Sequence, residues 1–335
     1  MFYELGLSPK VFTNENNHHD LHNFFFPYLG TLSPSCLIAN LKYGKWMEEI
    51  RNFLLNNPGA NLEIKELMKQ FDIIPGNYFS NRPDDGVVRD WPKEIQHQHS
   101  KCPFEFRIYD DNDLLSDKDL NNNQFNSFKA FYNAYFKGTI AISTNKIFIR
   151  NTDEFIRIAN KLIIFSNKIK IIDTYILSRD GFLDPLKRIL DHSINRPFMK
   201  ENQLTDIEIH FPDKNAKSKA EVSREFGNYI ADFRKRGTFL KFICWTERDD
   251  KILFHDRYFW TNKGALNLGK GHDLDTHIFE KGYIGVIKDY ETYKEINDTF
   301  DIKNGKSNFN GYWELPAPLP QITKPKAKPG KRNIY

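Results

Sequence analysis

The sequence predicts an α/β protein built on a largely parallel sheet that is flanked by helices. Helix and strand patterns alternate between residues 152 and 245, which is typical of parallel strands joined by helical crossovers. Aromatic residues make up 15% of the 335 residues, enough material for a large core. We expect a mainly helical or irregular region of unknown role at residues 1–150, the sheet domain at residues 151–312, and a flexible basic tail rich in proline and lysine at residues 313–335.

The helix and strand patterns place the elements of the sheet domain. Thr152 is a helix-capping residue, and apolar residues from Phe155 to Ile163 then recur at helical spacing. Further helices are predicted at residues 182–190 and 222–233, and strands at 169–175, 205–211, 239–245 and 282–287. Before residue 150, the patterns indicate two helices within 37–71, one helix at 128–136 and a hairpin at 139–150, separated by loops.

The positive charge of the chain is concentrated near its end. The formal charge is +4, but the stretch from Thr323 to Tyr335 alone carries five basic residues and no acidic one. Without those five, the chain has 43 basic and 44 acidic residues, so its body is not a broadly basic nucleic-acid binder. Any site for an anion must therefore be local.

Cysteine and hydropathy patterns set the expected compartment. Cys36, Cys102 and Cys244 are widely separated, which does not indicate a disulfide framework or a zinc ribbon and fits a reducing cytosol. No signal peptide and no apolar stretch of membrane-spanning length is seen, so we expect a cytoplasmic protein without a transmembrane segment. We also expect no cofactor and no metal.

The candidate site is the stretch from Phe254 to Gly264, followed by a glycine-rich loop. Its apolar lead-in predicts a strand, and alternation along a strand puts His255 and Arg257 on one face. An imidazole beside a permanent cation suits a bound phosphate, because the imidazole can attack or transfer a proton while the guanidinium holds the oxygens. The run Gly269-Lys270-Gly271 can add backbone N–H groups and a further cation.

In these residues the sequence resembles the phospholipase D-like superfamily. The similar branch has a single His-Asp-Arg motif and includes the C-terminal domain of proteins that carry a microtubule-interacting-and-trafficking domain. The resemblance covers residues 152–300 and implies a mixed, largely parallel sheet flanked by helices. The matching residues are His255-Asp256-Arg257, Asn262, Gly264, Gly269-Lys270-Gly271, Asp273 and, in an earlier strand, Ile172-Asp173-Thr174-Tyr175.

The resemblance implies a metal-independent phosphodiesterase, and a nuclease in particular. By resemblance, His255 would attack phosphorus to form a phosphohistidine, with Arg257 standing where superfamily members carry lysine. Asn262 stands where they carry aspartate, and Asp173 is the fourth expected catalytic residue. The residues expected to contact phosphate are Lys263, Gly269, Lys270, Gly271 and His272.

Superfamily members usually carry the motif twice, and this sequence carries it once. The second histidine can come from a two-fold partner that brings two His255 side chains into one cleft, or from His210, His272 or His277. His210 lies on an alternating strand, which also fits a structural histidine, whereas His272 lies in the glycine-rich loop. The expected partners are therefore a second copy or a partner protein, with nucleic acid or another phosphodiester as the ligand.

Two other interpretations stay open. The chain can be a catalytically degenerate module that binds a phosphorylated ligand, such as nucleic acid, a nucleotide or an anionic lipid headgroup, or a partner protein. The His-Asp-Arg motif can also be a surface cluster on a strand. Superfamily members with added N-terminal regions resemble bacterial anti-phage defence effectors, which adds a role in defence to what the resemblance implies.

Overall fold

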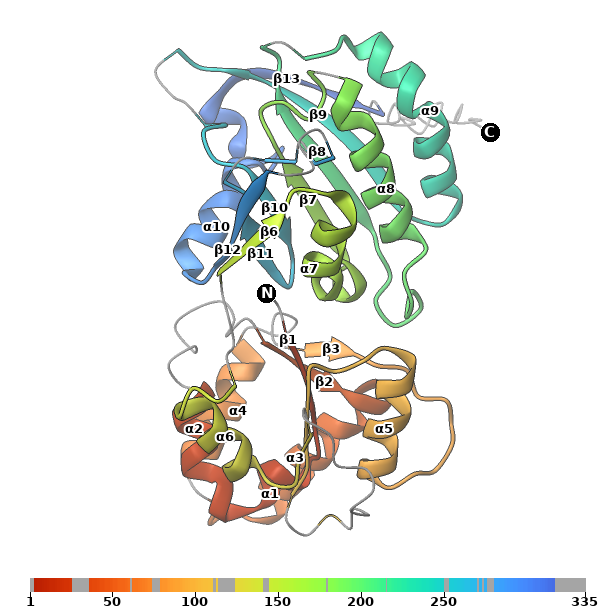
Figure 1. Ribbon diagram of the computed structural model, residues 1–335. Helices are drawn as coiled ribbons and strands as arrows, with labels where there is room; N and C mark the ends of the chain where they lie inside the picture. The colour runs from red at the N-terminus through yellow and green to blue at the C-terminus, as the bar shows by residue number, and fades with distance from the viewer. Residues whose placement is uncertain are drawn as a thin grey trace, which may run out of the picture.

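The computed structural model describes residues 3–25, 36–60, 62–73, 79–110, 113, 124–140, 145–178, 180–214, 216–249, 253–269, 271–272, 274–275 and 280–316. Figure 1 shows two lobes, each built on its own sheet: residues 3–140 form the first lobe and residues 145–316 the second. The α/β class predicted from the sequence is confirmed. No helix within the described residues is long and apolar enough to cross a membrane.

The first lobe contains a five-stranded sheet in the order β3-β2-β1-β4-β5, and each neighbouring pair is parallel. Its strands are β1 (Tyr3–Leu7), β2 (Cys36–Asn40), β3 (Phe79–Asn81), β4 (Phe106–Ile108) and β5 (Gln124–Phe125). The sequence patterns did not predict this sheet. These strands have five residues or fewer, too few for a clear alternating pattern.

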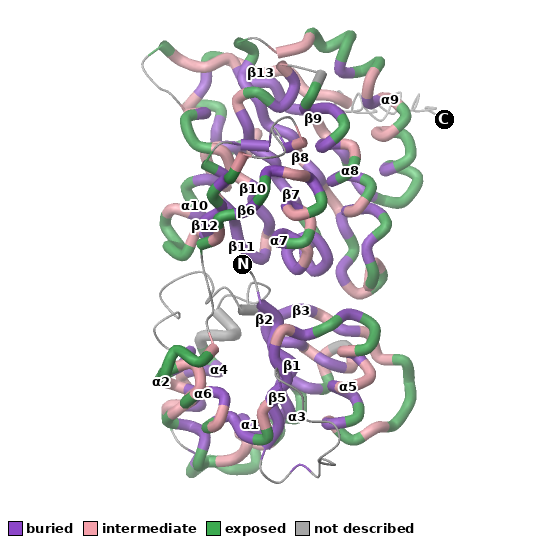
Figure 2. Tube along the Cα trace, viewed as in Figure 1, coloured by how far each residue is buried: buried purple, intermediate pink, exposed green. Residues whose placement is uncertain are grey.

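Helices surround the first sheet. They are α1 (Lys10–Thr13), α2 (His18–Phe25), α3 (Lys45–Asn56), α4 (Leu62–Ile73), α5 (Trp91–Lys101) and α6 (Phe128–Phe136). The helices predicted within residues 37–71 and at 128–136 are confirmed as α3, α4 and α6. Figure 2 shows that β1 is buried, as is expected for a parallel strand with helices on both faces. Trp46 of α3 joins this core and donates a 2.6 Å hydrogen bond to the carbonyl of Leu7.

The second lobe contains an eight-stranded mixed sheet in the order β13-β9-β8-β7-β10-β11-β12-β6. At its centre β7 (Lys168–Ile172), β8 (Asp206–Pro212) and β9 (Phe239–Glu247) pair in parallel, and the other neighbours pair antiparallel. These other strands are β6 (Asn145–Ile149), β10 (Tyr258–Thr261), β11 (Gly264–Asn267), β12 (Lys281–Ile287) and β13 (Phe309–Leu315). The sheet thus extends a few residues beyond both ends of the predicted range 151–312.

Helices cover both faces of the second sheet. One face packs against α7 (Thr152–Phe165), α8 (Leu183–Ile194) and α9 (Lys219–Lys235), and the other against α10 (Tyr290–Thr299). Neighbouring residues of β7 show the alternation: Ile171 lies in the core with Phe155 of α7, whereas Ile172 lies in the core with Tyr293 of α10. The cap of α7 is Asn151 rather than Thr152, because the Asn151 side chain accepts the hydrogen bond from the Glu154 backbone.

A buried charge network joins the two lobes. Glu4 of β1 is fully buried and pairs with Arg82 of the first lobe and, at 2.9 Å, with Lys161 of α7 in the second. The guanidinium of Arg82 also lies 5.1 Å from the ring centre of Phe165 and 5.0 Å from that of Phe198, both in the second lobe. The contact between the lobes is therefore desolvated and charge-paired.

Candidate functional site

The candidate site lies at the edge of the second sheet where the parallel strands end. Asp173 directly follows β7 and Arg257 directly precedes β10. Because Tyr258 pairs with Ile172 across these antiparallel strands, Asp173 and Arg257 are neighbours in the fold. The carboxyl ends of parallel strands are where α/β sheets bind ligands. This much of the arrangement agrees with the expectation from the sequence.

Asp173 is a buried anchor for the loop that follows β11. One of its carboxylate oxygens accepts hydrogen bonds from the backbone N–H of His272 at 2.7 Å and from His272 Nδ1 at 3.0 Å. The other oxygen accepts the backbone N–H of Tyr175 at 2.8 Å. Burial alone would raise the pKa of Asp173, but these hydrogen bonds and the charge of His272 together hold the pKa below its usual value. Asp173 is therefore a buried, ionised group that holds the loop in place.

Arg257 is held in place without a carboxylate partner among the described residues. Its Nη1 donates a 2.7 Å hydrogen bond to the Gly269 carbonyl, and its guanidinium carbon lies 5.4 Å from the ring centre of Tyr175. Its Nε is buried and has no hydrogen-bond partner. Gly271 lies so close that a Cβ atom there would clash with the Arg257 side chain and come within 2.5 Å of Asp173 Oδ2. The result is an oriented cation that no carboxylate of the described residues pairs with.

His255 lies in a bend before β10, so the expected strand position of this residue is wrong. The partner strand β7 ends at Ile172, opposite Tyr258, and leaves no pairing strand for residues 253–257. The imidazole is 82% exposed, and its Nδ1 lies 3.3 Å from Asp256 Oδ1. Asp256 in turn accepts a 3.1 Å hydrogen bond from the Tyr258 hydroxyl. The second ring nitrogen of His255 therefore faces solvent.

Asn262 and Lys263 lie at the opposite end of β10, so their expected roles at the phosphate are corrected. They form the two-residue turn between β10 and β11. The Asn262 side chain accepts the backbone N–H groups of Asn167 and Lys168 at 2.9 and 3.3 Å. The ammonium of Lys263 is buried against the Phe79 carbonyl at 2.6 Å, and burial lowers its pKa to about 8. The expected residues Lys270, Asp273 and His277 lie outside the described residues, as does the tail from residue 317.

His210 and His272 are the two candidates for the second histidine that lie within the described residues. Both are buried. His272 Nε2 is enclosed and has no hydrogen-bond partner, and its ring packs edge-on against Phe155. His210 accepts a 3.0 Å hydrogen bond from Trp245 Nε1 and stacks on the same indole ring. The structural interpretation of His210 is therefore confirmed, and His272 serves as the partner of Asp173.

Tyr175 is a site residue whose role the sequence reasoning missed. It belongs to the motif segment that includes Asp173, but its contact with Arg257 depends on the pairing of β7 with β10. An aromatic residue two positions after a strand-ending aspartate was the available signal. The structure thus brings together Asp173, Tyr175, Arg257, Gly269, Gly271 and His272.

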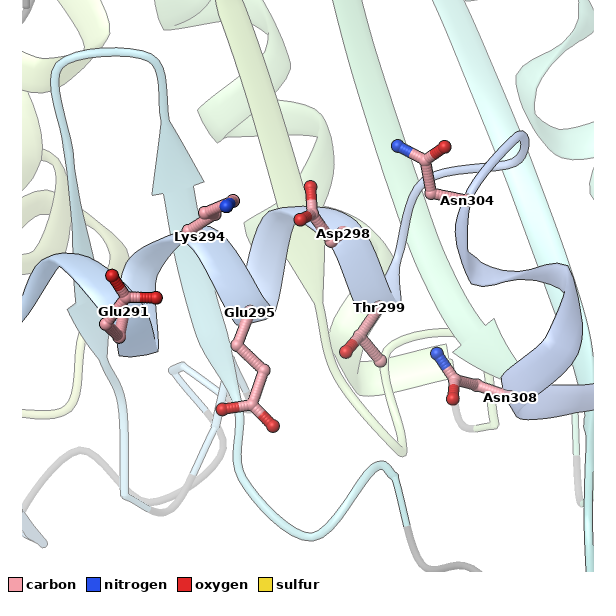
Figure 3. Close-up of a pocket in the computed structure, with 7 residues that line it drawn as sticks. All are labelled: Glu291, Lys294, Glu295, Asp298, Thr299, Asn304 and Asn308. Atoms are coloured by element: carbon pink, nitrogen blue, oxygen red, sulfur yellow. The ribbon is translucent and has the colours of Figure 1, made fainter.

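A separate surface hollow of about 410 Å³ runs along α10 and is drawn in Figure 3. Its lining includes the carboxylates of Glu291, Glu295 and Asp298 and a single ammonium, that of Lys294. Carboxylates in this excess repel a phosphate group. The hollow is therefore not a second phosphate site.

Comparison of the sequence with protein-family models and with curated proteins gives no match. Among the solved structures that are similar at a low level, two illustrate the range. One is the archaeal chromatin protein TrmBL2, which shows a novel mode of DNA binding, with 14% identity, a TM-score of 0.28 and coverage of 48% of this chain and 51% of that one. The other is phosphatidylserine synthase of Haemophilus influenzae, with 15% identity, a TM-score of 0.27 and coverage of 53% and 47%. The chain spans about half the length of each, and these TM-scores carry no argument about function.

The fold and the site together define a class of protein. It is a two-lobed α/β protein whose second sheet ends in an exposed imidazole and an oriented guanidinium.

Proposed function

We propose that the chain is a phospholipase D-like phosphodiesterase that acts as a nuclease through His255. The observation that supports this most is an exposed imidazole, with Nδ1 3.3 Å from Asp256 Oδ1, only two residues before the oriented guanidinium of Arg257 in the chain. A histidine whose Nδ1 donates to a carboxylate presents the lone pair of Nε2 for attack. A guanidinium that pairs with no carboxylate in the described part of the chain suits the phosphoryl oxygens.

In the proposed reaction, His255 Nε2 forms a bond to phosphorus and the bond from phosphorus to the leaving oxygen breaks. The leaving oxygen takes a proton from solvent water, which the exposure of the site admits. Water then attacks phosphorus, the phosphorus–nitrogen bond breaks, and free His255 is restored. Arg257 balances the charge on the phosphoryl oxygens in both steps. Nucleophilic catalysis of this kind requires no divalent ion.

The test uses the full chain with labelled single-stranded and duplex DNA and RNA in the presence of a chelator. We expect strand cleavage that His255→Ala abolishes and Arg257→Ala strongly reduces. The matched control is His19→Ala, because His19 is also an exposed histidine, with 74% of its side chain accessible, but lies in the first lobe. If the wild-type chain cleaves none of these substrates, or if His255→Ala cleaves as well as wild type, the nuclease proposal is wrong.

A binding module without catalysis is the second candidate, and the burial of His272 favours it. No other described histidine presents an accessible ring nitrogen near His255 to protonate a leaving group, since His272 Nε2 is enclosed. In this case Arg257→Ala would weaken binding of a phosphorylated ligand while the free energy of unfolding stays the same. Binding that ignores both this change and the salt concentration would contradict a phosphate contact.

A two-fold partner is the proposed source of a second histidine if the chain is catalytic. Two copies facing each other would place two exposed His255 side chains on one phosphate. Mixing wild type with His255→Ala in excess would then suppress activity beyond simple dilution. The proposed role in anti-phage defence rests on the family resemblance, and a plaque assay on cells that express wild type or His255→Ala tests it.

A further inference from the structure

Tyr175 presents an aromatic surface directly beside the candidate phosphate site. Tyr175 is exposed, with 41% of its surface accessible to solvent. The guanidinium of Arg257 lies 5.4 Å from the centre of its ring. The backbone on either side is fixed. The Tyr175 N–H donates to Asp173 Oδ1 at 2.8 Å, and the Tyr175 carbonyl accepts the Ser178 N–H at 2.9 Å. The ring is therefore carried by a hydrogen-bonded turn.

The same turn is tied to the segment that carries His255. Thr174 Oγ1 donates a 2.6 Å hydrogen bond to the carbonyl of Phe254. Tyr175 directly follows Thr174 in the chain, and His255 directly follows Phe254. The hydrogen bond therefore keeps the two residues near each other, and both exposed rings belong to one patch of surface. With Arg257, which contacts the Tyr175 ring, this part of the surface carries an aromatic ring, a cation and an imidazole.

This combination matches the parts of an unpaired nucleotide. A planar base can stack on an exposed tyrosine ring, and its phosphate can pair with a neighbouring arginine. In a duplex the bases are stacked on each other and are not available to a protein ring without being unpaired. A lipid headgroup offers a phosphate but no planar ring for Tyr175.

We infer that the site accepts single-stranded nucleic acid, with one base stacked on Tyr175 and an adjacent phosphate held by Arg257. This inference rests on the proposed function, because it takes the Arg257 site to be the phosphate site. It adds a base-binding residue and a preference for single strands over duplexes. The near-neutral body of the chain agrees with a recognition site of a few nucleotides rather than an extended basic track.

The first experiment compares ligands of equal phosphate number. Binding is measured with the full-length His255→Asn variant, so that the ligand is not consumed, using a labelled single-stranded oligonucleotide, its duplex, and an abasic strand of the same length and charge. We expect the single strand to bind about tenfold more tightly than the abasic strand, the order of effect that one stacked base provides. Equal binding of the normal and abasic strands, or tighter binding of the duplex, overturns the inference.

The second experiment removes the ring from the protein in the same background. Tyr175→Leu should weaken single-strand binding by about tenfold and leave binding of the abasic strand unchanged, whereas Tyr175→Phe should bind like the parent. Phe239→Leu is the matched control, because Phe239 is an exposed aromatic residue at the opposite end of the sheet. Tyr175→Leu that binds the single strand as the parent does overturns the inference.

Failure of the stacking inference is distinguishable from failure of the proposed function. If Arg257→Ala weakens the normal and abasic strands equally and Tyr175→Leu weakens neither, the phosphate contact stands and base stacking is wrong. If Arg257→Ala weakens neither strand, the phosphate site itself is wrong. Vesicles that contain an anionic phospholipid and compete with the single strand at equal phosphate concentration would assign the site to lipid and overturn the inference.

Discussion

Asp173 and His272 share two hydrogen bonds through a single carboxylate oxygen, one from the His272 backbone at 2.7 Å and one from its ring at 3.0 Å. The two residues are far apart in sequence, and the bonds tie the loop after β11 to the end of β7. The same loop supplies the Gly269 carbonyl that orients Arg257. Asp173 therefore positions the cation of the site through the loop rather than through a direct hydrogen bond to the guanidinium.

The lowered pKa of Asp173 predicts a specific dependence of stability on pH. A carboxyl whose pKa is lower in the folded than in the unfolded state stabilises the fold above its unfolded pKa, and this contribution is lost as the pH falls through the folded pKa. At neutral pH we expect Asp173→Asn to be less stable than wild type by about 1–3 kcal/mol. The substitution leaves the buried donors of Tyr175 and His272 without a full set of acceptors. As the pH falls below about 4, the two curves should converge. Urea unfolding at a series of pH values measures the free energy of unfolding of the wild type and the variant. Parallel plots of the two free energies against pH would show that Asp173 is not the titrating group.

Gly271→Ala tests whether the close approach of the loop sets the position of Arg257. The φ angle of Gly271 is +87°, and a Cβ atom there would lie 2.5 Å from Asp173 Oδ2 and 3.0 Å from Arg257 Nε. We expect about tenfold weaker binding of a phosphorylated ligand, which corresponds to the loss of about one charge-assisted hydrogen bond. Gly227→Ala in α9 is the control, since its Cβ would meet no atom within 4 Å. Unchanged binding in Gly271→Ala would mean that Arg257 is not positioned by this loop.

The sequence could predict at which edge of the sheet the site lies, but not how its side chains are arranged. The strand predicted at residues 169–175 exists as β7, although it ends earlier, at Ile172, and Asp173 lies at its carboxyl end as expected. The positions of Asn262 and Lys263 were missed because the strand was expected to begin before His255 rather than at Tyr258, which hid the short hairpin after it. The contact of Tyr175 with Arg257 depends on which strands pair, and no local pattern carries that information.

The sheet of the first lobe shows a different limit. Its strands are five residues or fewer, and β5 has only Gln124 and Phe125. Such strands are stabilised by neighbours distant in the chain, as in the pairing of Leu5 with both Ile38 and Phe106. Period-two patterns need longer runs to be recognised, so the helices α3, α4 and α6 were predicted and the sheet between them was not.

Thr174→Val removes the hydrogen bond between the segments that carry Tyr175 and His255 while keeping the shape of the side chain. We expect a loss of about 1 kcal/mol in the free energy of unfolding, typical of one hydrogen bond, and a larger relative loss in cleavage or binding. Thr205→Val is the matched control, because Thr205 Oγ1 makes the same kind of bond, to the Asn167 carbonyl at 3.0 Å, at the other end of the sheet. If the two variants lose the same stability and change ligand binding equally, Thr174 has no specific role in the site.

Arg82→Met tests the charge network between the lobes. It leaves the fully buried carboxylate of Glu4 with the Lys161 ammonium and a hydrogen bond from Ser80 Oγ, and it removes a guanidinium that lies over the rings of Phe165 and Phe198. Removing one partner of a buried ion pair typically costs about 3–5 kcal/mol, because the remaining charge stays desolvated.

The control for Arg82→Met is Arg157→Met. Arg157 also pairs with a carboxylate, Glu154, but its side chain is 57% exposed, so the pair is screened by solvent and its loss should change stability by less than about 1 kcal/mol. Urea unfolding compares the two variants, and limited proteolysis reports whether the lobes separate. If Arg82→Met is no less stable than Arg157→Met, the charge network does not hold the lobes together. If Arg82→Met instead loses stability while its folded fraction still binds the ligand at Arg257, the network supports the fold and the phosphate site is confined to the second lobe.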